Sequence, residues 1–179
     1  MKLKIVQDED PPNPRTENDC FGKIVHWHNR YNFGERIDDP AKWLLGLSPG
    51  SLILPLCLLD HSGLHLYIGT GAHACDPGGW DSGPVGFIYA DEDAIRKEFN
   101  ISNFQAIPQW ALDKAKKILE QEVKTYDQFL QGDVWGYAIE DDEGNHLDSC
   151  WGFFGREYCE EAGREALAHA EKHSFDPVI

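Results

Sequence analysis

Basic side chains are scarce in this chain of 179 residues, in which 16 Lys and Arg stand against 31 Asp and Glu. The net charge of −15, counted with neutral histidines, repels the phosphates of DNA and RNA. We therefore expect no direct nucleic-acid binding. A protein partner with a basic surface is the class that this charge favours.

Long apolar runs are also missing. The sequence contains no stretch of about 18 apolar residues, the length that a membrane helix needs. Residues 1–15 lack the apolar region of a signal peptide. We therefore expect neither membrane insertion nor secretion, and a cytoplasmic location follows.

The five cysteines are an odd number and form no C-x-x-C pair. This pattern argues against a disulfide framework and against a zinc ribbon, and it favours reduced thiols. A phosphate-binding G-x-x-x-x-G-K-[ST] motif is absent as well. The sequence thus indicates no cofactor.

Large apolar side chains are plentiful, and hydrophobic residues make up 41% of the chain. That share is enough for a buried core, and with no long linker the sequence predicts a single domain over residues 1–179. Residues 52–69 predict a β-hairpin, in which Pro55 indicates a bulge or an edge because proline has no amide hydrogen. Residues 133–154 predict a second hairpin.

A long amphipathic helix is predicted from Pro108 to about Gln131, because apolar residues recur there along one stripe. Residues 157–173 predict a final helix, and residues 92–99 predict a short one capped by Asp91. Together the elements predict an α+β fold. We expect an antiparallel β-sheet of about five or six strands built from hairpins, with two or three helices packed mainly on one face.

The segment Ser149–Trp151 is similar to the surroundings of a papain-type nucleophile, with Cys150 as the candidate thiol. A papain-type thiol lies at a helix N-terminus and has its histidine more than about a hundred residues downstream. Here only 29 residues follow Cys150. The hairpin register places Cys150 opposite Tyr137 and Gly152 opposite Trp135, so we expect Cys150 to be a small buried residue in a strand.

The glycine-rich loop Cys75–Gly86 is the most distinctive segment outside the hairpins, and it contains Trp80, Asp81 and Ser82. Two interpretations are open. Glycines let a backbone approach a ligand and an aromatic ring anchors it, which favours a binding or catalytic loop. Alternatively, Trp80 covers the core while Asp81 and Ser82 bond to backbone amides of the turn.

Histidines raise the question of a metal site. His26 and His28 stand at positions i and i+2, so within a strand both imidazoles would leave the same face. Further candidate ligands come from neighbouring turns: His61, His65, His73, Cys75 and Asp81. No regular ligand spacing joins these residues, so no metal is assigned.

Carboxylates gather in blocks at turns and helix starts, where they are too exposed for acid catalysis. Distributed over one surface, such blocks imitate a polyanion or steer a protein onto a basic groove. No catalytic residue is assigned. The candidate binding residues are Asp91, Glu92, Asp93, Glu140, Asp141, Asp142 and Glu143, together with Trp80 and Asp81.

Three segments carry a resemblance: LPLCLLDHSG, WDSGPVGFIYADEDAIRKEF and EQEVKTYDQFLQGDVWGYAIEDDEGNHLDSCWGF. In this order they resemble a group of accessory proteins encoded by bacteriophages and prophages. The resemblance covers about residues 50–155 and implies a small protein made in an infected bacterial cell. By analogy with small acidic phage proteins, it implies an inhibitor of a host defence nuclease, such as an anti-restriction or anti-CRISPR protein.

The sequence therefore favours a binding protein over an enzyme. The expected function is an acidic phage-encoded protein that binds and inhibits a host factor with a basic surface, through nucleic-acid mimicry. The alternative is a small thiol- or metal-dependent hydrolase in the region of His61, Cys75 and Asp81.

Overall fold

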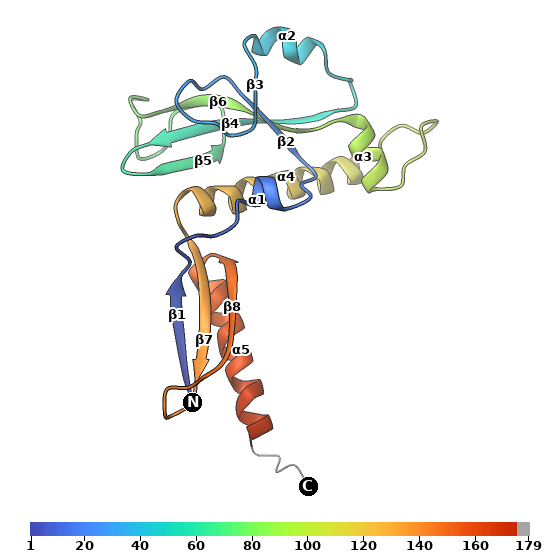
Figure 1. Ribbon diagram of the computed structural model, residues 1–179. Helices are drawn as coiled ribbons and strands as arrows, with labels where there is room; N and C mark the ends of the chain where they lie inside the picture. The colour runs from blue at the N-terminus through green and yellow to red at the C-terminus, as the bar shows by residue number, and fades with distance from the viewer. Residues whose placement is uncertain (175–179) are drawn as a thin grey trace. The chain divides into compact units, whose positions relative to one another are not determined.

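The computed structural model describes residues 1–174, with side chains as far as Lys172, and the fold is α+β (Figure 1). Among these residues, no helix has the length and apolar character that crossing a membrane requires. The elements in chain order are β1 (Lys2–Gln7), α1 (Pro14–Glu17), β2 (Lys23–His26), β3 (Glu35–Arg36), α2 (Pro40–Leu45), β4 (Leu52–Asp60), β5 (Leu64–Ile68), β6 (Ser82–Ala90), α3 (Glu92–Glu98), α4 (Gln109–Leu130), β7 (Val134–Glu140), β8 (His146–Phe154) and α5 (Arg156–Ser174).

The strands form two sheets. Three strands pair in the order β1-β7-β8, and five pair in the order β3-β2-β6-β4-β5. All pairs are antiparallel except β2 with β3, which is parallel. The expected α+β class is confirmed, whereas the expected single antiparallel sheet is wrong.

The chain divides into two compact units with one sheet each. The terminal unit comprises residues 1–17 and 128–179, and the central unit comprises residues 18–127. The central unit is thus an insertion between β1 and β7. This division does not test the expected single domain over residues 1–179, which stays a prediction.

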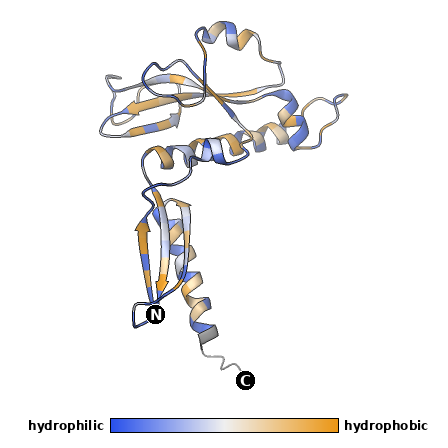
Figure 2. Ribbon diagram, in the orientation of Figure 1, coloured by the Kyte–Doolittle hydropathy of each residue, from blue (hydrophilic) through white to orange (hydrophobic). Residues whose placement is uncertain are grey.

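Helix α4 covers one face of the central sheet. Hydrophobic and hydrophilic residues alternate along it (Figure 2), and its buried stripe includes Leu119 and Val123. The packing against the sheet is close: a Cβ atom on Gly22 would lie 2.4 Å from Cδ2 of Leu119 and 3.1 Å from Cδ1 of Ile88 in β6. The predicted amphipathic helix is therefore confirmed.

Helix α2 lies on the other face of the central sheet. Its Trp43 ring stacks on Phe87 at 5.7 Å between centroids and meets Tyr89 edge-on at 4.9 Å. Phe87 and Tyr89 flank Ile88 in β6, and successive side chains of a strand point to opposite faces. Helices α2 and α4 therefore cover opposite faces, as Figure 1 shows, so the helices are not gathered mainly on one side.

The predicted hairpin over residues 52–69 is confirmed as β4 and β5, which pair from Leu56 with Ile68 to Asp60 with Leu64. A register shift lies near Pro55, between Leu56, which faces Gly86, and Cys57, which faces Pro84. The residue without a partner in this register is therefore Val85 of β6, whereas Pro55 pairs with Phe87, so the bulge is in β6 and not at Pro55. A bulge bends the strand and leaves one residue unpaired.

Helix α5 packs on one face of the terminal sheet. Tyr137, Ile139 and Cys159 form the buried centre of this contact. The predicted pairing of Tyr137 with Cys150 is confirmed. The predicted pairing of Trp135 with Gly152 is wrong, because the register shifts between Trp135 and Tyr137 and brings Phe153 opposite Trp135.

Cys150 is exposed, so the prediction of a buried residue is wrong. The strand and its pairing were inferred correctly, but β8 is an edge strand of a sheet with three strands. An edge strand has a neighbour on one side alone, and alternation specifies a face without specifying that anything covers it. The buried thiols are Cys57 and Cys159, and burial raises the pKa of both.

Candidate functional site

Asp76 shapes the glycine-rich loop of the central unit. Its carboxylate accepts hydrogen bonds from the backbone N–H of Trp80 at 3.2 Å and of Asp81 at 2.9 Å, and from the hydroxyl of Ser82 at 2.8 Å. These bonds, first among them that from Ser82, lower the pKa of Asp76. The predicted bond of Ser82 to a backbone amide is confirmed, because its Oγ accepts from the backbone N–H of His73 at 3.0 Å, whereas the role of Asp76 was not predicted. The sequence feature that could have indicated this role of Asp76 is the Asp-Pro-Gly-Gly segment, which is a turn signature.

Trp80 is 91% exposed, so the interpretation in which it covers the core is wrong. One edge of its indole lies beside Gly78, where a Cβ atom would be 2.6 Å from Cδ1 and Nε1. Such an exposed ring offers an aromatic surface to a ligand. The binding-loop interpretation is the one that this geometry favours.

A cavity of about 430 Å³ lies beside Trp80, within the central unit. Its volume is within the range of small-ligand pockets. The loop before β6, the ends of β4 and β6 and the segment after β2 together build it. The lining residues are His28, Arg30, Leu58, Asp60, Trp80, Asp81, Ser82, Gly83, Pro84 and Val85.

His28 is a neutral donor in this lining. Its Nδ1 accepts hydrogen bonds from the backbone N–H of Arg30 at 3.3 Å and of Tyr31 at 3.2 Å. In neutral imidazole one nitrogen accepts and the other donates, so the proton belongs on Nε2. Burial lowers the pKa of His28, which keeps the ring uncharged.

Two carboxylates of the lining each hold a polar partner. Asp60 Oδ2 accepts from Arg30 Nη1 at 3.1 Å and from the Tyr31 hydroxyl at 2.9 Å, and the latter bond raises the pKa of Tyr31. Asp81 Oδ2 lies 2.9 Å from Nδ1 of His61. The backbone N–H of Asp60 also donates to the carbonyl of Asp81, which fixes the two residues beside each other.

Asp127 forms a buried polar contact outside the cavity. It is 8% exposed and lies 2.8 and 2.9 Å from Nδ1 of His65 through its two oxygens. The backbone N–H of Leu66 donates to the same carboxylate at 2.7 Å. This group ties α4 to β5, and nothing in the sequence pattern indicated it.

Of the residues expected for a metal or thiol site, the structure brings His61 and Asp81 together, at 2.9 Å between Nδ1 and Oδ2. Cys75 is exposed and meets an imidazole through its backbone N–H, which donates to Nδ1 of His73 at 3.2 Å. His28 lies beyond the end of β2, and the buried His26 ring is 3.3 Å from Asn32 Oδ1. Within the described residues, no group of three or more His, Cys, Asp or Glu has a metal-binding arrangement.

The first acidic block has structural partners. Asp91 caps α3 through the Ala94 N–H at 2.8 Å and pairs with Lys23 Nζ at 2.8 Å. The bond from Lys23, followed by that from Ala94, lowers the pKa of Asp91. Glu92 pairs with Arg96 and accepts a bond from the hydroxyl of Ser48. Of this block, Asp93 is the exposed carboxylate.

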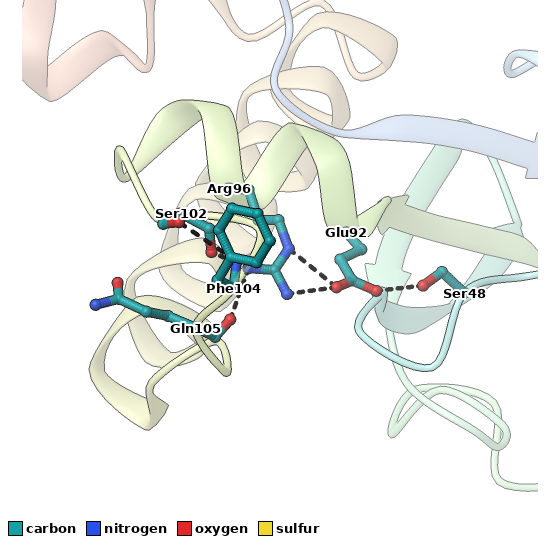
Figure 3. Close-up of polar contacts among 6 residues, drawn as sticks. All are labelled: Ser48, Glu92, Arg96, Ser102, Phe104 and Gln105. Atoms are coloured by element: carbon teal, nitrogen blue, oxygen red, sulfur yellow. Dashed lines mark hydrogen bonds and ion pairs between the residues drawn. The ribbon is translucent and has the colours of Figure 1, made fainter.

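The contacts of Glu92 extend into the loop after α3 (Figure 3). Arg96 Nη1 donates to the carbonyls of Ser102 and Gln105, at 2.8 Å each. Phe104 lies between these two anchored residues and is 100% exposed. The ion pair of Glu92 and Arg96 therefore serves the internal structure of the central unit.

The second block, at the turn between β7 and β8, belongs to the terminal unit. Glu140 pairs with Lys4, and Asp141 accepts backbone hydrogen bonds that close the turn, from Glu143 at 2.9 Å and Asn145 at 2.8 Å. Asp142 has an 87% exposed side chain, 2.9 Å from the amino group of Met1. Glu143 is exposed. The first block thus belongs to the central unit and the second to the terminal unit.

The negative charge is concentrated in the terminal unit. Its 69 residues include 16 Asp and Glu against 6 Lys and Arg, a net charge of −10. The central unit has 15 against 10, a net charge of −5. The smaller unit thus carries two thirds of the net negative charge of the chain.

Helix α5 contributes a stripe of exposed carboxylates to the terminal unit. Glu157, Glu161 and Glu165 are spaced four residues apart, which places them along one side of the helix, and all three are exposed. Like charges at this spacing destabilise a helix by about 0.2–0.5 kcal/mol per pair.

Known proteins give no further guide to the site, because no protein-family model, no curated protein and no solved structure matches the chain. The resemblance to phage-encoded proteins stays a prediction.

Proposed function

We propose that the protein is an acidic, phage-encoded interaction protein that binds a basic surface of a host protein and inhibits it. The observation that supports this function is the net charge of −10 on the 69-residue terminal unit. The exposed carboxylates of α5 are the surface that a basic partner meets. Trp80 and Asp81 of the central unit are a second contact.

The physical basis is long-range attraction. A strongly acidic body is drawn to a basic groove, which raises the association rate, and added salt screens this attraction. A basic groove of a nuclease ordinarily holds the phosphates of its nucleic acid. A protein that occupies this groove competes with the nucleic acid, so inhibition by mimicry follows from the same charge.

Capture from a bacterial lysate followed by a competition assay tests this proposal. Tagged protein is incubated with the lysate and washed at about 50 mM or about 500 mM sodium chloride, between which the screening length shortens severalfold. We expect basic, nucleic-acid-binding proteins at low salt and their loss at high salt. A captured protein is then purified, and its binding to DNA or RNA is measured with increasing amounts of the acidic protein.

Two triple variants of equal charge change locate the surface. The first replaces Glu157, Glu161 and Glu165 by Gln, and we expect it to bind the purified partner about tenfold more weakly at low salt, from about 0.5 kcal/mol per exposed charge. The control removes three exposed carboxylates of the central unit that are not candidate binding residues, as Asp38→Asn, Glu98→Gln and Asp113→Asn. We expect the control to bind as the unaltered protein does.

Several results count against the proposal. Equal retention of partners at both salt concentrations excludes an electrostatic docking surface. Equal loss in both triple variants excludes the α5 stripe as the contact. A partner that keeps its nucleic acid at saturating amounts of the acidic protein excludes inhibition by mimicry.

A further inference from the structure

The cavity beside Trp80 has the composition of a site for a cationic group. Its lining contains two carboxylates, Asp60 and Asp81, and one guanidinium, Arg30, while His28 is neutral. The lining therefore has a net charge of −1, inside a protein whose own charge is −15. An anion entering this cavity is repelled, and a cation is attracted.

Each carboxylate of the lining has one oxygen that can accept a hydrogen bond from a ligand. Arg30 and Tyr31 bond to Oδ2 of Asp60, and His61 bonds to Oδ2 of Asp81. In the part of the chain that the structure describes, neither Oδ1 atom has a hydrogen-bond partner. Their own partners orient both side chains, so a ligand meets acceptors that are already held in place.

Trp80 supplies an aromatic surface next to these acceptors. Gly78 lies at one edge of the indole, so the ring surface is open, as the exposed fraction of 91% requires. A cation over the face of a tryptophan is the strongest cation–π arrangement among the aromatic side chains. The site thus combines a π surface with anionic hydrogen-bond acceptors.

Gly83 is a lining residue of the cavity, and a Cβ atom built on it would have no atom within 4 Å. We therefore expect a larger side chain at this position to occupy part of the cavity without displacing a neighbour close to its first carbon. This property makes Gly83 a direct means to block the site.

We propose that this cavity receives an arginine side chain of the basic partner protein, with the guanidinium stacked on Trp80 and donating to Oδ1 of Asp60 and of Asp81. The inference rests on the proposed function for the identity of the partner, and on the cavity for the chemistry of the side chain. Arginine fits better than lysine, because the planar guanidinium stacks on a ring and donates to two carboxylates at once. A lysine ammonium fills less of a cavity of about 430 Å³.

The chemistry of the cavity is tested without the partner. Protein labelled with ¹⁵N is titrated with Nα-acetyl-arginine amide, and the indole signals of the six tryptophans are followed by NMR. The Trp80→Phe variant identifies the Trp80 signal. We expect a saturable shift of this signal with a millimolar Kd, and at least about threefold weaker binding of the lysine derivative.

The matched control ligand is Nα-acetyl-citrulline amide, which has the shape of the arginine derivative without its charge. We expect no saturable shift from it. Equal shifts from the arginine and the citrulline derivatives overturn the proposal. The absence of a saturable shift from the arginine derivative up to about 0.1 M overturns it as well. Tighter binding of the lysine derivative overturns the preference for arginine.

Variants assign the binding to this cavity. We expect Asp81→Asn to weaken binding of the arginine derivative about fivefold to tenfold, and Gly83→Leu to abolish it. The control Glu98→Gln removes an exposed carboxylate outside the lining and leaves the affinity unchanged. Far-ultraviolet circular dichroism confirms that each variant folds. An unchanged affinity in a folded Gly83→Leu variant overturns the proposal.

The two proposals fail separately. If the arginine derivative binds but no basic partner is captured, the cavity chemistry stands and the proposed function falls. If a partner is captured but binds the Gly83→Leu variant with unchanged affinity, the proposed function stands and the role of the cavity falls.

Discussion

Asp127 is the clearest test of how the central unit is held together. Its carboxylate takes hydrogen bonds from the His65 ring and the Leu66 backbone, at 2.7 to 2.9 Å, while it is 8% exposed. A hydrogen bond to a charged group contributes about 1.5–3 kcal/mol, and a buried donor left without a partner costs about 1–3 kcal/mol. We expect Asp127→Ala to lower the free energy of unfolding by about 3 kcal/mol, because both donors lose one shared acceptor.

The assay is urea unfolding followed by circular dichroism, with thermal unfolding beside it. A loss of about 3 kcal/mol corresponds to a Tm lower by about 6–12 °C for a protein of this size. Asp113→Ala is the control, since Asp113 is an exposed carboxylate on the same helix, and we expect a change below about 0.5 kcal/mol. Asp127→Asn keeps one carbonyl acceptor, so we expect its loss of unfolding free energy to lie between those of Asp127→Ala and Asp113→Ala.

Hydrogen exchange gives a local measure of the same bond. In the Asp127→Ala variant the amide of Leu66 loses its acceptor, so we expect it to exchange faster. If Asp127→Ala is no less stable than Asp113→Ala, the carboxylate is not the link between α4 and β5. Unchanged protection of the Leu66 amide leads to the same conclusion.

Three further predictions concern packing, pH and thiols. Gly22→Ala places a methyl group 2.4 Å from the Leu119 side chain, so we expect a loss of about 1–3 kcal/mol in urea unfolding, whereas an unchanged midpoint contradicts the packing of α4. The lowered pKa of Asp91 stabilises the fold above the unfolded value of about 3.9 and loses this effect as pH falls through the folded value. Asp91→Asn should therefore cost stability at pH 7 and flatten the decline of stability in acid, and an acid limb as steep as before contradicts the ion pair. Cys75 and Cys150 should react fast with a thiol reagent and the two buried cysteines slowly, which Cys75→Ser and Cys150→Ser check by each removing one fast thiol.

The sequence predicted local elements well and their long-range partners poorly. The helix α4 and the hairpins β4–β5 and β7–β8 depend on periodicity and turn residues within short segments. The pairing of β1 with β7 joins Lys2 to Glu140, far apart in the chain. Alternation marks a strand but carries no information on its neighbour, so the division into two sheets was not visible.

The residues of the candidate site were likewise predictable only where they lie close together in the chain. Trp80 and Asp81 stood out because they share one unusual loop. The role of Arg30 and Asp60 was not visible, because they meet the loop through the fold and because Asp60 looked like an ordinary turn residue. The neutral state of His28 depends on two backbone amides whose positions no sequence pattern specifies.

The arrangement of the terminal unit has a consequence for synthesis on the ribosome. The strand β1 emerges first, whereas its neighbour β7 emerges after the whole central unit has been made. During this interval β1 is a strand without a partner, which chaperones and other nascent chains can reach. The charged side chains Lys2 and Lys4 on this strand protect it, since lysine on an unpaired strand opposes aggregation.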